Sequence, residues 1–254
     1  MMLPHQRREK ILDLIREDGH AKVLQLSNIF KVTEVTIRQD LEKLEKDGFI
    51  EREHGGAYLK NIGMSVKNIV LQNQENLQQK AAIARKALEH INNGDTIILD
   101  SGSTTTEIAK LILGFKNLTV ITNSLNIALV LGVDPEINLV VTGGEFKAPT
   151  LSLTGQKAAD FFDGLHVDKL FLATAGITLK SGLTYPSISD IVVKRAMIES
   201  ANEVFLVADS GKIGKSSFAS LGTLSLIDFL ITDSKISEED INMLKRNDIK
   251  MIIA

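Results

Sequence analysis

Apolar residues recur every three or four positions through most of the first fifty residues, the spacing that buries one face of an α-helix. The pattern predicts three short helices. Pro4 precedes the first, Gly19 ends it, and Thr33 is a favourable N-cap residue for the third. The third helix is expected to stop at Gly48 and to direct four apolar side chains inward: Val35, Ile37, Leu41 and Leu44.

Two short runs follow at residues 49–52 and 57–59, on either side of a turn at residues 54–56, and predict a two-stranded wing. Three closely spaced helices with a short turn before the third suit a helix-turn-helix. In such motifs the N-terminal residues of the last helix contact base edges in the major groove of DNA. The expected fold of residues 1–60 is therefore a winged helix-turn-helix, for which DNA binding is one of two interpretations.

The positions that would face DNA carry suitable side chains. Thr36, Arg38 and Gln39 lie at the start of the third helix, away from its apolar face. Arginine can bridge two acceptors of guanine, and glutamine can do likewise at adenine. In the wing, Arg52 and His54 are candidates for a phosphate or minor-groove contact.

A purely structural interpretation fits the same periodicity. Residues 1–60 carry as many lysines and arginines as aspartates and glutamates, and a small helical domain often has an arginine on a solvated face. The acids Glu42, Glu45, Asp47 and Glu51, however, come late in the third helix and beyond it. The neutral sum is therefore compatible with a positive N-terminal tip.

From residue 94 onward, apolar strands alternate with helical patterns. Strands are expected at 96–99, 118–121, 137–141, 170–173, 204–207, 229–232 and 250–253, and helices at 76–91, 104–113, 124–131, 156–163 and 187–200. Continuous apolar strands between helices indicate a parallel sheet covered on both faces. The predicted fold class is α/β: a winged helix-turn-helix domain (1–60), a linker (61–75), and a larger doubly wound, mainly parallel, Rossmann-like sensor domain (76–254).

Small, polar or glycine residues follow five of the predicted strands, where ligands of such sheets gather. A glycine turn that opens a helix presents backbone N–H groups to an anion. We expect the helix start at residues 102–105 to bind an anion together with Lys212. Lys194 is the weaker candidate, because Lys194 and Arg195 also fit a solvated helix face. The full set of candidate effector-binding residues is Asp100, Gly102, Ser103, Thr104, Thr105, Asn123, Gly143, Gly144, Gly176, Lys194 and Lys212.

Each of these glycine-rich or polar segments, taken alone, is also compatible with an ordinary turn. Two common nucleotide-binding motifs, the P-loop and the dinucleotide fingerprint, are absent from the sequence. The segment from Gly211 to Ser217 resembles a phosphate-binding P-loop, but Asp209 stands where its first glycine is required. The G-x-G-x-x-G fingerprint of dinucleotide-binding proteins is absent. The sequence thus favours a phosphorylated small ligand over a nucleotide.

Catalysis finds little support, and no catalytic residue, metal site or cofactor is assigned. The five histidines lack metal-ligand spacing, and there is no cysteine. The alternative function is a sugar-phosphate isomerase with an accessory DNA-binding domain. Isomerisation needs a positioned base such as a carboxylate, and residues 173–178 contain none. Asp100 and Asp209 lie at strand ends, where they are as suited to capping turns as to chemistry.

The composition places the chain among soluble globular proteins. Its hydrophobic share is 44%, its charged share 24% and its net charge −3, so no bulk basicity indicates nucleic acid. No apolar run approaches the ~18 residues of a membrane span, and the N-terminus has no signal-peptide core. We expect a cytoplasmic protein with no membrane partner.

The N-terminal pattern resembles the signature of the DeoR family of bacterial transcriptional regulators. It comprises Arg7, Ile11, Ile15, Thr33, the run from Thr36 to Leu41 and the run from Arg52 to Ala57. The resemblance implies a winged helix-turn-helix that binds operator DNA, usually as a repressor of sugar-catabolic genes, with Thr33, Thr36, Arg38, Gln39 and Arg52 near the DNA. Many members carry a basic residue where this chain has Gln39.

The C-terminal half resembles the sensor domain of the same family, whose fold is similar to ribose-5-phosphate isomerase and related sugar-phosphate isomerases. The matching pieces are residues 100–105, 122–124, 142–144, the Gly176 segment, 194–198 and 209–212. The resemblance implies a phosphorylated sugar or related metabolite as effector. Many members have a glutamate shortly before the lysine helix, where only Asp190 could stand in. A homo-oligomer, dimer or tetramer, is also expected, because one such motif reads only a few base pairs.

Overall fold

The computed structural model describes residues 2–18, 20–53, 55–59, 76–148 and 150–254. The chain divides into two compact units, Met1–Gln72 and Asn73–Ala254, and each is described by itself. The predicted linker at 61–75 and the candidate His54 lie outside the described residues. None of the described helices is long and apolar enough to cross a membrane.

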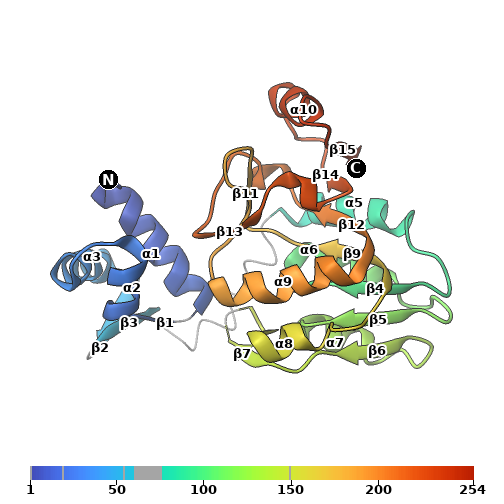
Figure 1. Cartoon of the computed structure of the whole chain (residues 1–254), viewed down its shortest axis with the longest axis horizontal. Coiled ribbons are helices and arrows are strands. Elements are labelled where there is room, and N and C mark those ends of the chain that lie inside the picture. The colour runs from blue at the N-terminus through green and yellow to red at the C-terminus, as the bar shows by residue number, and fades with distance from the viewer. Residues whose placement is uncertain (1, 19, 54, 60–75, 149) are drawn as a thin grey trace. The chain divides into compact units, whose positions relative to one another are not determined.

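The first unit contains the three predicted helices and the predicted wing (Figure 1). Its helices are α1 (Pro4–Asp18), α2 (Val23–Phe30) and α3 (Glu34–Lys46), and its strands are β1 (His20–Lys22), β2 (Ile50–Glu53) and β3 (Gly56–Leu59). The sheet has the order β1-β3-β2, and both pairings are antiparallel. The winged helix-turn-helix is thus confirmed. The strand β1 was not predicted, because it is only three residues long and pairs with residues far along the chain.

One apolar position of α3 is corrected by the structure. Ile37, Leu41 and Leu44 are buried as expected, but Val35 is 64% exposed. Successive helix residues are rotated by about 100°, so Val35 lies about 200° from Ile37 and faces away from the core. The prediction that Val35 points inward was therefore wrong.

The second unit is built on a seven-stranded sheet in which every pairing is parallel. The order is β15-β14-β12-β9-β4-β5-β6 (Figure 1). The strands are β4 (Thr96–Leu99), β5 (Thr119–Thr122), β6 (Asn138–Val141), β9 (Val167–Leu172), β12 (Ala201–Val207), β14 (Phe229–Thr232) and β15 (Lys250–Ile253). All seven lie at or within three residues of their predicted positions.

Helices cover both faces of this sheet, so the doubly wound α/β class is confirmed. On one face, α5 (Leu77–Leu88), α6 (Ser103–Leu111) and α7 (Leu125–Leu131) pack on alternate strand residues such as Ile97, Leu99 and Phe205. On the other face, α8 (Gln156–Asp160), α9 (Ile188–Ser200) and α10 (Glu238–Lys245) pack on the intervening residues, among them Ile98 and Leu206. The helix α10 was not predicted.

Two small antiparallel sheets were also missed. One joins β10 (Gly176–Thr178), β11 (Gly182–Tyr185) and β13 (Ala219–Gly222), and the other joins β7 (Glu145–Lys147) and β8 (Ser152–Thr154). These strands have three or four residues each, too few for a period of two to stand out. Of these strands, β7 and β10 come shortly after β6 and β9, so they help to shape the region where a ligand is expected.

Candidate functional site

The helix α3 begins at a side-chain cap formed by two of the predicted DNA-contacting residues. The Thr33 hydroxyl accepts a hydrogen bond from the backbone N–H of Thr36 (3.2 Å), and the two hydroxyl oxygens lie 3.0 Å apart. Such a cap satisfies a free N–H group of the helix start and fixes the direction of the helix. Thr33 is exposed and Thr36 is half-buried, so both lie at the surface of the α3 start.

Arg38 and Gln39 are both exposed on the first turns of α3. The Arg38 guanidinium donates a hydrogen bond to the Glu34 carboxylate one turn earlier (2.9 Å), and both side chains are close to half exposed or more. Exposed pairs at this spacing contribute only about 0.3–0.5 kcal/mol to stability. Arg38 can therefore exchange this partner for a base edge at little cost.

A buried ion pair holds α3 against α1. The Arg7 guanidinium lies 2.5 Å from the Asp40 carboxylate, and Arg8 lies 3.6 Å from its other oxygen. Arg7 and Asp40 are 7% and 3% exposed. Both residues belong to the family signature in the sequence, but their ion pair was not predicted because 33 residues separate them. The pair orients α3, and with it the exposed start of that helix.

Acidic side chains late in α3 are compensated by nearby cations. Lys43 pairs with Asp47 (3.0 Å) and Lys46 with Glu42 (2.9 Å). The Lys46 ammonium lowers the pKa of the Glu42 carboxyl. These pairs lie toward the C-terminal end of α3, and Glu34 at its N-terminal end is paired with Arg38.

The wing residue Arg52 is exposed and tied to the end of α3. Its backbone N–H donates to a Glu45 carboxylate oxygen (3.1 Å), and its guanidinium lies 3.8 Å from the other oxygen. This contact sets the position of β2 relative to α3. The other predicted wing contact, His54, lies outside the described residues.

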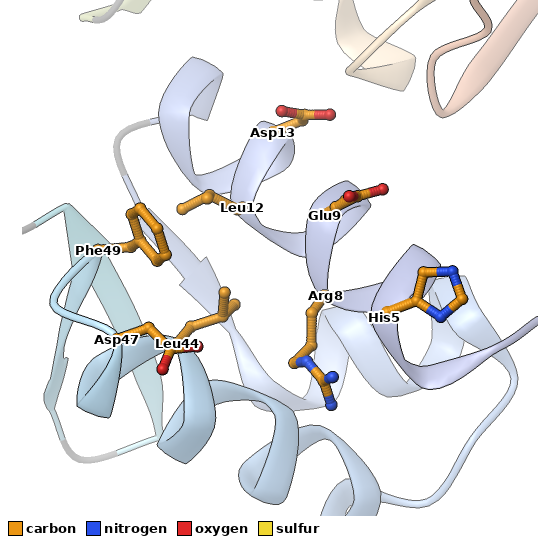
Figure 2. A pocket seen from close by; sticks show the side chains of 8 residues that line it. All are labelled: His5, Arg8, Glu9, Leu12, Asp13, Leu44, Asp47 and Phe49. Atoms are coloured by element: carbon orange, nitrogen blue, oxygen red, sulfur yellow. The ribbon is translucent and has the colours of Figure 1, made fainter.

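A groove of about 550 Å³ lies between α1 and the α3–β2 connection (Figure 2). Leu12, Leu44 and Phe49 point toward one another in it, and the carboxylates of Glu9 and Asp13 project from α1. With Asp47, the lining therefore contains three acidic residues. The lining also contains Arg8 and His5, so the groove carries side chains of both charge types around its apolar centre.

In the second unit, the strand order reverses between β4 and β9. The chain proceeds from β4 to β5 and β6 on one side, then returns to β9 and continues outward to β15 on the other. Open α/β sheets bind ligands beyond the carboxyl ends of the strands at such a switch point. The residues that follow β4 and β9 are Asp100 and Ala173.

Asp100 is fully buried at this switch point and forms an ion pair with Lys194 of α9. The Lys194 ammonium lies 2.7 Å from both carboxylate oxygens, and the backbone N–H groups of Ser101 (2.7 Å) and Ala173 (3.0 Å) also donate to them. Burial raises the pKa of Asp100, while the Lys194 charge and these hydrogen bonds oppose the rise. The ammonium also lies 4.8 Å from the ring centre of Tyr185.

This pair corrects the predicted environment of Lys194. The side chain is 5% exposed, so Lys194 does not belong to a solvated helix face, although its neighbour Arg195 is exposed. Its partner precedes it by 94 residues, and no local pattern could reveal that contact. The Lys194 ammonium therefore lies where it offsets negative charge on the Asp100 carboxylate at the switch point.

The helix α6 begins beside Asp100, as predicted. Gly102 is its N-cap and Ser103 its first residue. The Thr105 hydroxyl donates to the backbone oxygen of Asp100 (2.6 Å), which fixes the turn. Thr104 and Thr105 are buried, whereas Ser103 is only half-buried. The free N–H groups of the helix start and the Ser103 hydroxyl are therefore the groups that can reach an anion.

Asn123 follows β5 and lies against the same turn. Its side-chain oxygen accepts from the Ser101 N–H (2.9 Å), and its amide donates to the Leu153 backbone oxygen (3.1 Å). It is 2% exposed. Asn123 therefore supports the turn after β4 and links it to β8.

Three of the candidate glycines are required by packing, and a Cβ on Gly102 would lie 2.6 Å from the Ala173 side chain. A Cβ on Gly176 would lie 2.5 Å from the Lys215 backbone oxygen. Gly144 has φ +128°, and a Cβ there would lie 2.7 Å from Ala158. Gly143 is exposed and faces open space. Close packing thus explains why Gly102, Gly144 and Gly176 are glycines.

Lys212 lies after β12, in the short 3-10 helix η1 (Ser210–Lys212), and is half-buried. Asp209 caps this turn by accepting from the Gly211 N–H (3.1 Å), and it also accepts from the Asn76 amide (3.1 Å). Strands β12 and β4 are separated only by β9, a spacing of about 10 Å. A lysine side chain can cover much of that distance toward the α6 start.

A second buried ion pair was missed by the sequence reasoning. The Lys147 ammonium on β7 lies 2.9 Å from the Asp190 carboxylate on α9, and both side chains are close to fully buried. Asp190, the possible substitute for the family glutamate, is therefore engaged with Lys147. The partners are 43 residues apart, beyond the reach of any spacing rule.

Within the residues that the structure describes, no group of three or more histidines, cysteines, aspartates or glutamates is arranged to hold a metal ion.

The chain matches two family models in succession. Residues 7–62 match the DeoR-like helix-turn-helix domain, and residues 75–234 match the DeoR C terminal sensor domain. Together they span the winged helix-turn-helix and six of the seven strands of the parallel sheet.

Curated relatives match over nearly their whole lengths. The HTH-type transcriptional regulator GolR of Listeria innocua serovar 6a is 37% identical over 237 residues, which cover 93% of each chain. The glycerol-3-phosphate regulon repressor of Escherichia coli K12 is 32% identical over 231 residues, covering 90% of each. Among solved structures, ribose 5-phosphate isomerase A of Methanocaldococcus jannaschii matches 54% of this chain and 55% of its own, with 18% identity and a TM-score of 0.41. The family matches and the full-length relatives show that this chain belongs to the DeoR family of transcriptional regulators, with a helix-turn-helix domain followed by a sensor domain.

Proposed function

We propose that this protein is a repressor of sugar-metabolism genes that reads operator DNA with the start of α3. The observation that carries this proposal is the surface formed by the exposed Arg38 and Gln39 and the half-buried Thr36, held in place by the buried Arg7–Asp40 pair. Thr33 caps the same helix, and Arg52 and His54 of the wing contact the DNA backbone or minor groove. The exposed Val35 adds an apolar group that suits a thymine methyl.

Operator recognition is tested by selecting bound sequences from a random DNA pool with the full chain. Enrichment of one motif, followed by tight binding in a mobility shift at physiological salt, supports the proposal. If the pool shows no enrichment while the folded protein is present in excess, sequence-specific binding by α3 is excluded.

The proposed effector is a phosphorylated sugar or a related metabolite, bound at the switch point of the sensor domain. The α6 start supplies aligned N–H groups, Ser103 a hydroxyl and Lys212 a full positive charge. Asp100, Gly102, Thr104, Thr105, Asn123, Gly143, Gly144, Gly176 and Lys194 shape or line the same crevice. The E. coli relative is named for the glycerol-3-phosphate regulon, and glycerol 3-phosphate is a small phosphorylated compound.

A thermal-shift screen of the full chain tests the effector. Each sugar phosphate is compared with its unphosphorylated counterpart, and a ligand at 100 times its Kd is expected to add ~2.7 kcal/mol of stability. Hits are then added to the operator mobility shift. If no phosphorylated compound changes the melting temperature or the operator affinity more than its unphosphorylated counterpart does, the proposed phosphate site is wrong.

We further propose that the sensor domain has no isomerase activity. A catalytic base must be free to accept a proton, yet the Asp100 carboxylate is fully buried and paired with Lys194. Asp209 is also buried and accepts two hydrogen bonds. A coupled isomerase assay with the sugar phosphates of the screen is expected to show no turnover above the protein-free rate.

The protein acts as a homo-oligomer in the cytoplasm, where operator DNA is located. One helix-turn-helix reads a short half-site, and two copies are needed to discriminate an operator from the many competing genomic sequences. The selected motif is therefore expected to contain two related half-sites. Sedimentation of the full chain should give at least the mass of a dimer.

A further inference from the structure

We propose that a second copy of this chain pairs with the free edge of β6 in antiparallel orientation, and that exposed apolar side chains of α7 and its flanking loops complete the interface. This interface rests on the proposed homo-oligomer and names the surface that forms it. The term β6 edge is used below for strand Asn138–Val141 together with Leu113, Leu129 and Val133.

The strand β6 ends the seven-stranded sheet and has no neighbour on its outer side within the described residues (Figure 1). The N–H groups of Asn138 and of Thr142, the residue that follows β6, donate inward, to the backbone oxygens of Leu118 and Thr122 on the β5 side. Backbone groups of a strand alternate in direction, so those of Leu139 and Val141 point outward. An outward row of N–H and C=O groups is complementary to another strand.

Natural edge strands are usually protected by a charged residue, a proline or a covering element. The strand β6 reads Asn-Leu-Val-Val and contains neither a charge nor a proline. The opposite edge strand, β15, begins with the exposed Lys250 and therefore carries such a charge. The two free edges of the sheet thus differ, and only β6 lacks a charge that opposes pairing.

The helix beside β6 is apolar on its outer face as well. The seven residues of α7 include no charged side chain, and Leu129 is 74% exposed. Val133 follows the helix and is 76% exposed. Leu113 is also exposed and lies in the adjoining loop, since the Gly114 N–H donates to the Asp134 carboxylate (2.8 Å). Large apolar side chains that are exposed close together are normally covered, so these side chains indicate a protein partner.

The partner that fits both features is a second copy of this chain. With a twofold axis at Val140, Leu139 of one copy lies opposite Val141 of the other, and these residues exchange reciprocal hydrogen bonds through their outward backbone groups. No like charges meet, because the strand has none. The same axis brings the α7 side of each copy to the interface, which matches the isologous contacts of twofold dimers.

The natural chain has no cysteine, so single-cysteine variants give a clean test. Facing residues of a non-hydrogen-bonded antiparallel pair have Cα atoms about 4.5 Å apart, within the range of a disulfide. Val140→Cys in the full chain should form a covalent dimer on mild oxidation. The matched control is Ile252→Cys, at the corresponding position of β15, which should stay monomeric on a denaturing, non-reducing gel.

A second pair of variants is independent of cross-linking. Leu129→Lys should raise the Kd of the dimer about tenfold or more in sedimentation, because it places a charge in an apolar contact. Ile188→Lys adds the same charge at an exposed position of α9 and should leave the Kd unchanged. Equal far-UV circular dichroism and melting temperatures exclude misfolding as the cause.

The possible outcomes distinguish an error in the proposed interface from an error in the proposed homo-oligomer. A dimeric wild type in which Val140→Cys fails to cross-link and Leu129→Lys leaves the Kd unchanged would overturn the β6 edge and leave the homo-oligomer standing. A wild type that stays monomeric at the highest concentrations tested, with and without operator DNA, would overturn both. Cross-linking through Ile252→Cys instead would assign the dimer to β15 and reject β6.

Discussion

Asp40 of α3 accepts a hydrogen bond from the Arg7 guanidinium of α1, and both side chains are almost fully buried. This contact connects α3, the helix proposed to read DNA, to α1, the helix that supports it. Removal of one partner from such a pair leaves an uncompensated buried charge, which typically costs about 3–5 kcal/mol.

We therefore expect Asp40→Ala to lower the free energy of unfolding of the first unit by about 3–5 kcal/mol. The double variant Arg7→Leu with Asp40→Leu should recover most of that loss, because no unpaired charge remains. Urea unfolding followed by circular dichroism measures both effects. Equal stability of Asp40→Ala and wild type would mean that the pair does not hold α3 in place.

Arg38→Ala should relax operator selectivity and leave the fold intact. Loss of a bidentate base contact is expected to cost about 1–3 kcal/mol per subunit and to affect one operator position in each half-site. Lys43→Ala is the matched control, because it also removes an exposed cation of α3 but lies toward the other end of the helix. The measurement is binding to a set of operators that each carry a single base change. If Arg38→Ala and Lys43→Ala both give the wild-type pattern of affinities, α3 does not dock on DNA as proposed.

Arg52→Ala should weaken binding almost equally for all DNA sequences. A phosphate contact carries charge but little sequence information. The slope of log affinity against log salt should flatten by ~0.9 for the contact removed. Lys46→Ala, on the last turn of α3, serves as control and should keep the slope. A change in selectivity at constant slope would assign Arg52 to base recognition instead.

Ser103→Glu should abolish the response to the effector while operator binding persists in its absence. The substitution places a carboxylate at the α6 start, where the phosphate is proposed to bind, and Ser103 is half-buried. Thr104 is less suitable, because it is 6% exposed and a glutamate there would disturb packing. Mobility shifts with and without the effector are compared for Ser103→Glu, Lys212→Ala and the exposed control Ser225→Glu. A full response in the first two variants would exclude this crevice.

Lys194→Met should increase the dependence of stability on pH. Burial raises the folded-state pKa of Asp100 above the unfolded value of ~3.9, so its contribution to stability falls as pH rises from that value through the folded pKa. Without the Lys194 charge the folded pKa rises further, and the loss extends toward neutral pH.

The variant should thus be several kcal/mol less stable than wild type at pH 7.5, about 3–5 by the cost of breaking a buried pair, and closer to wild type at pH 5. Urea unfolding at the two pH values measures this difference. The double variant Asp100→Asn with Lys194→Met removes the titrating group and should lose the additional pH dependence. A constant deficit at both pH values in the single variant would show that Asp100 is not the group responsible.

The sheet was predictable because its strands are continuous apolar runs. Residues 96–99 and 229–232 match β4 and β14 in both bounds, since a strand buried on both faces leaves a signal that needs no partner. The strand β11 left no such signal, because its partners include Ser220, far along the chain. The same reason hid the pairing of Lys194 with Asp100: periodicity identifies a helix face but does not say which distant residue meets it.

The site was predictable to the extent that it follows from strand ends and helix starts. The turn at Asp100 and the start of α6 lie where the sequence placed them. The burial of Thr104 was not predictable, because the neighbouring turns that cover it are fixed by the tertiary fold.

The start of α3 has a consequence for how these regulators diversify. Arg38 finds its partner within its own helix, and Thr36 interacts with the cap of that helix, whereas the support of α3 comes from Asp40 on its buried side. If α3 reads operator DNA as proposed, substitutions at these surface positions are expected to change the preferred DNA sequence without an accompanying loss of folding stability. On the same proposal, one or two mutations in this helix would give a duplicated gene a new operator, because the residues proposed to read DNA are not those that hold the helix in place.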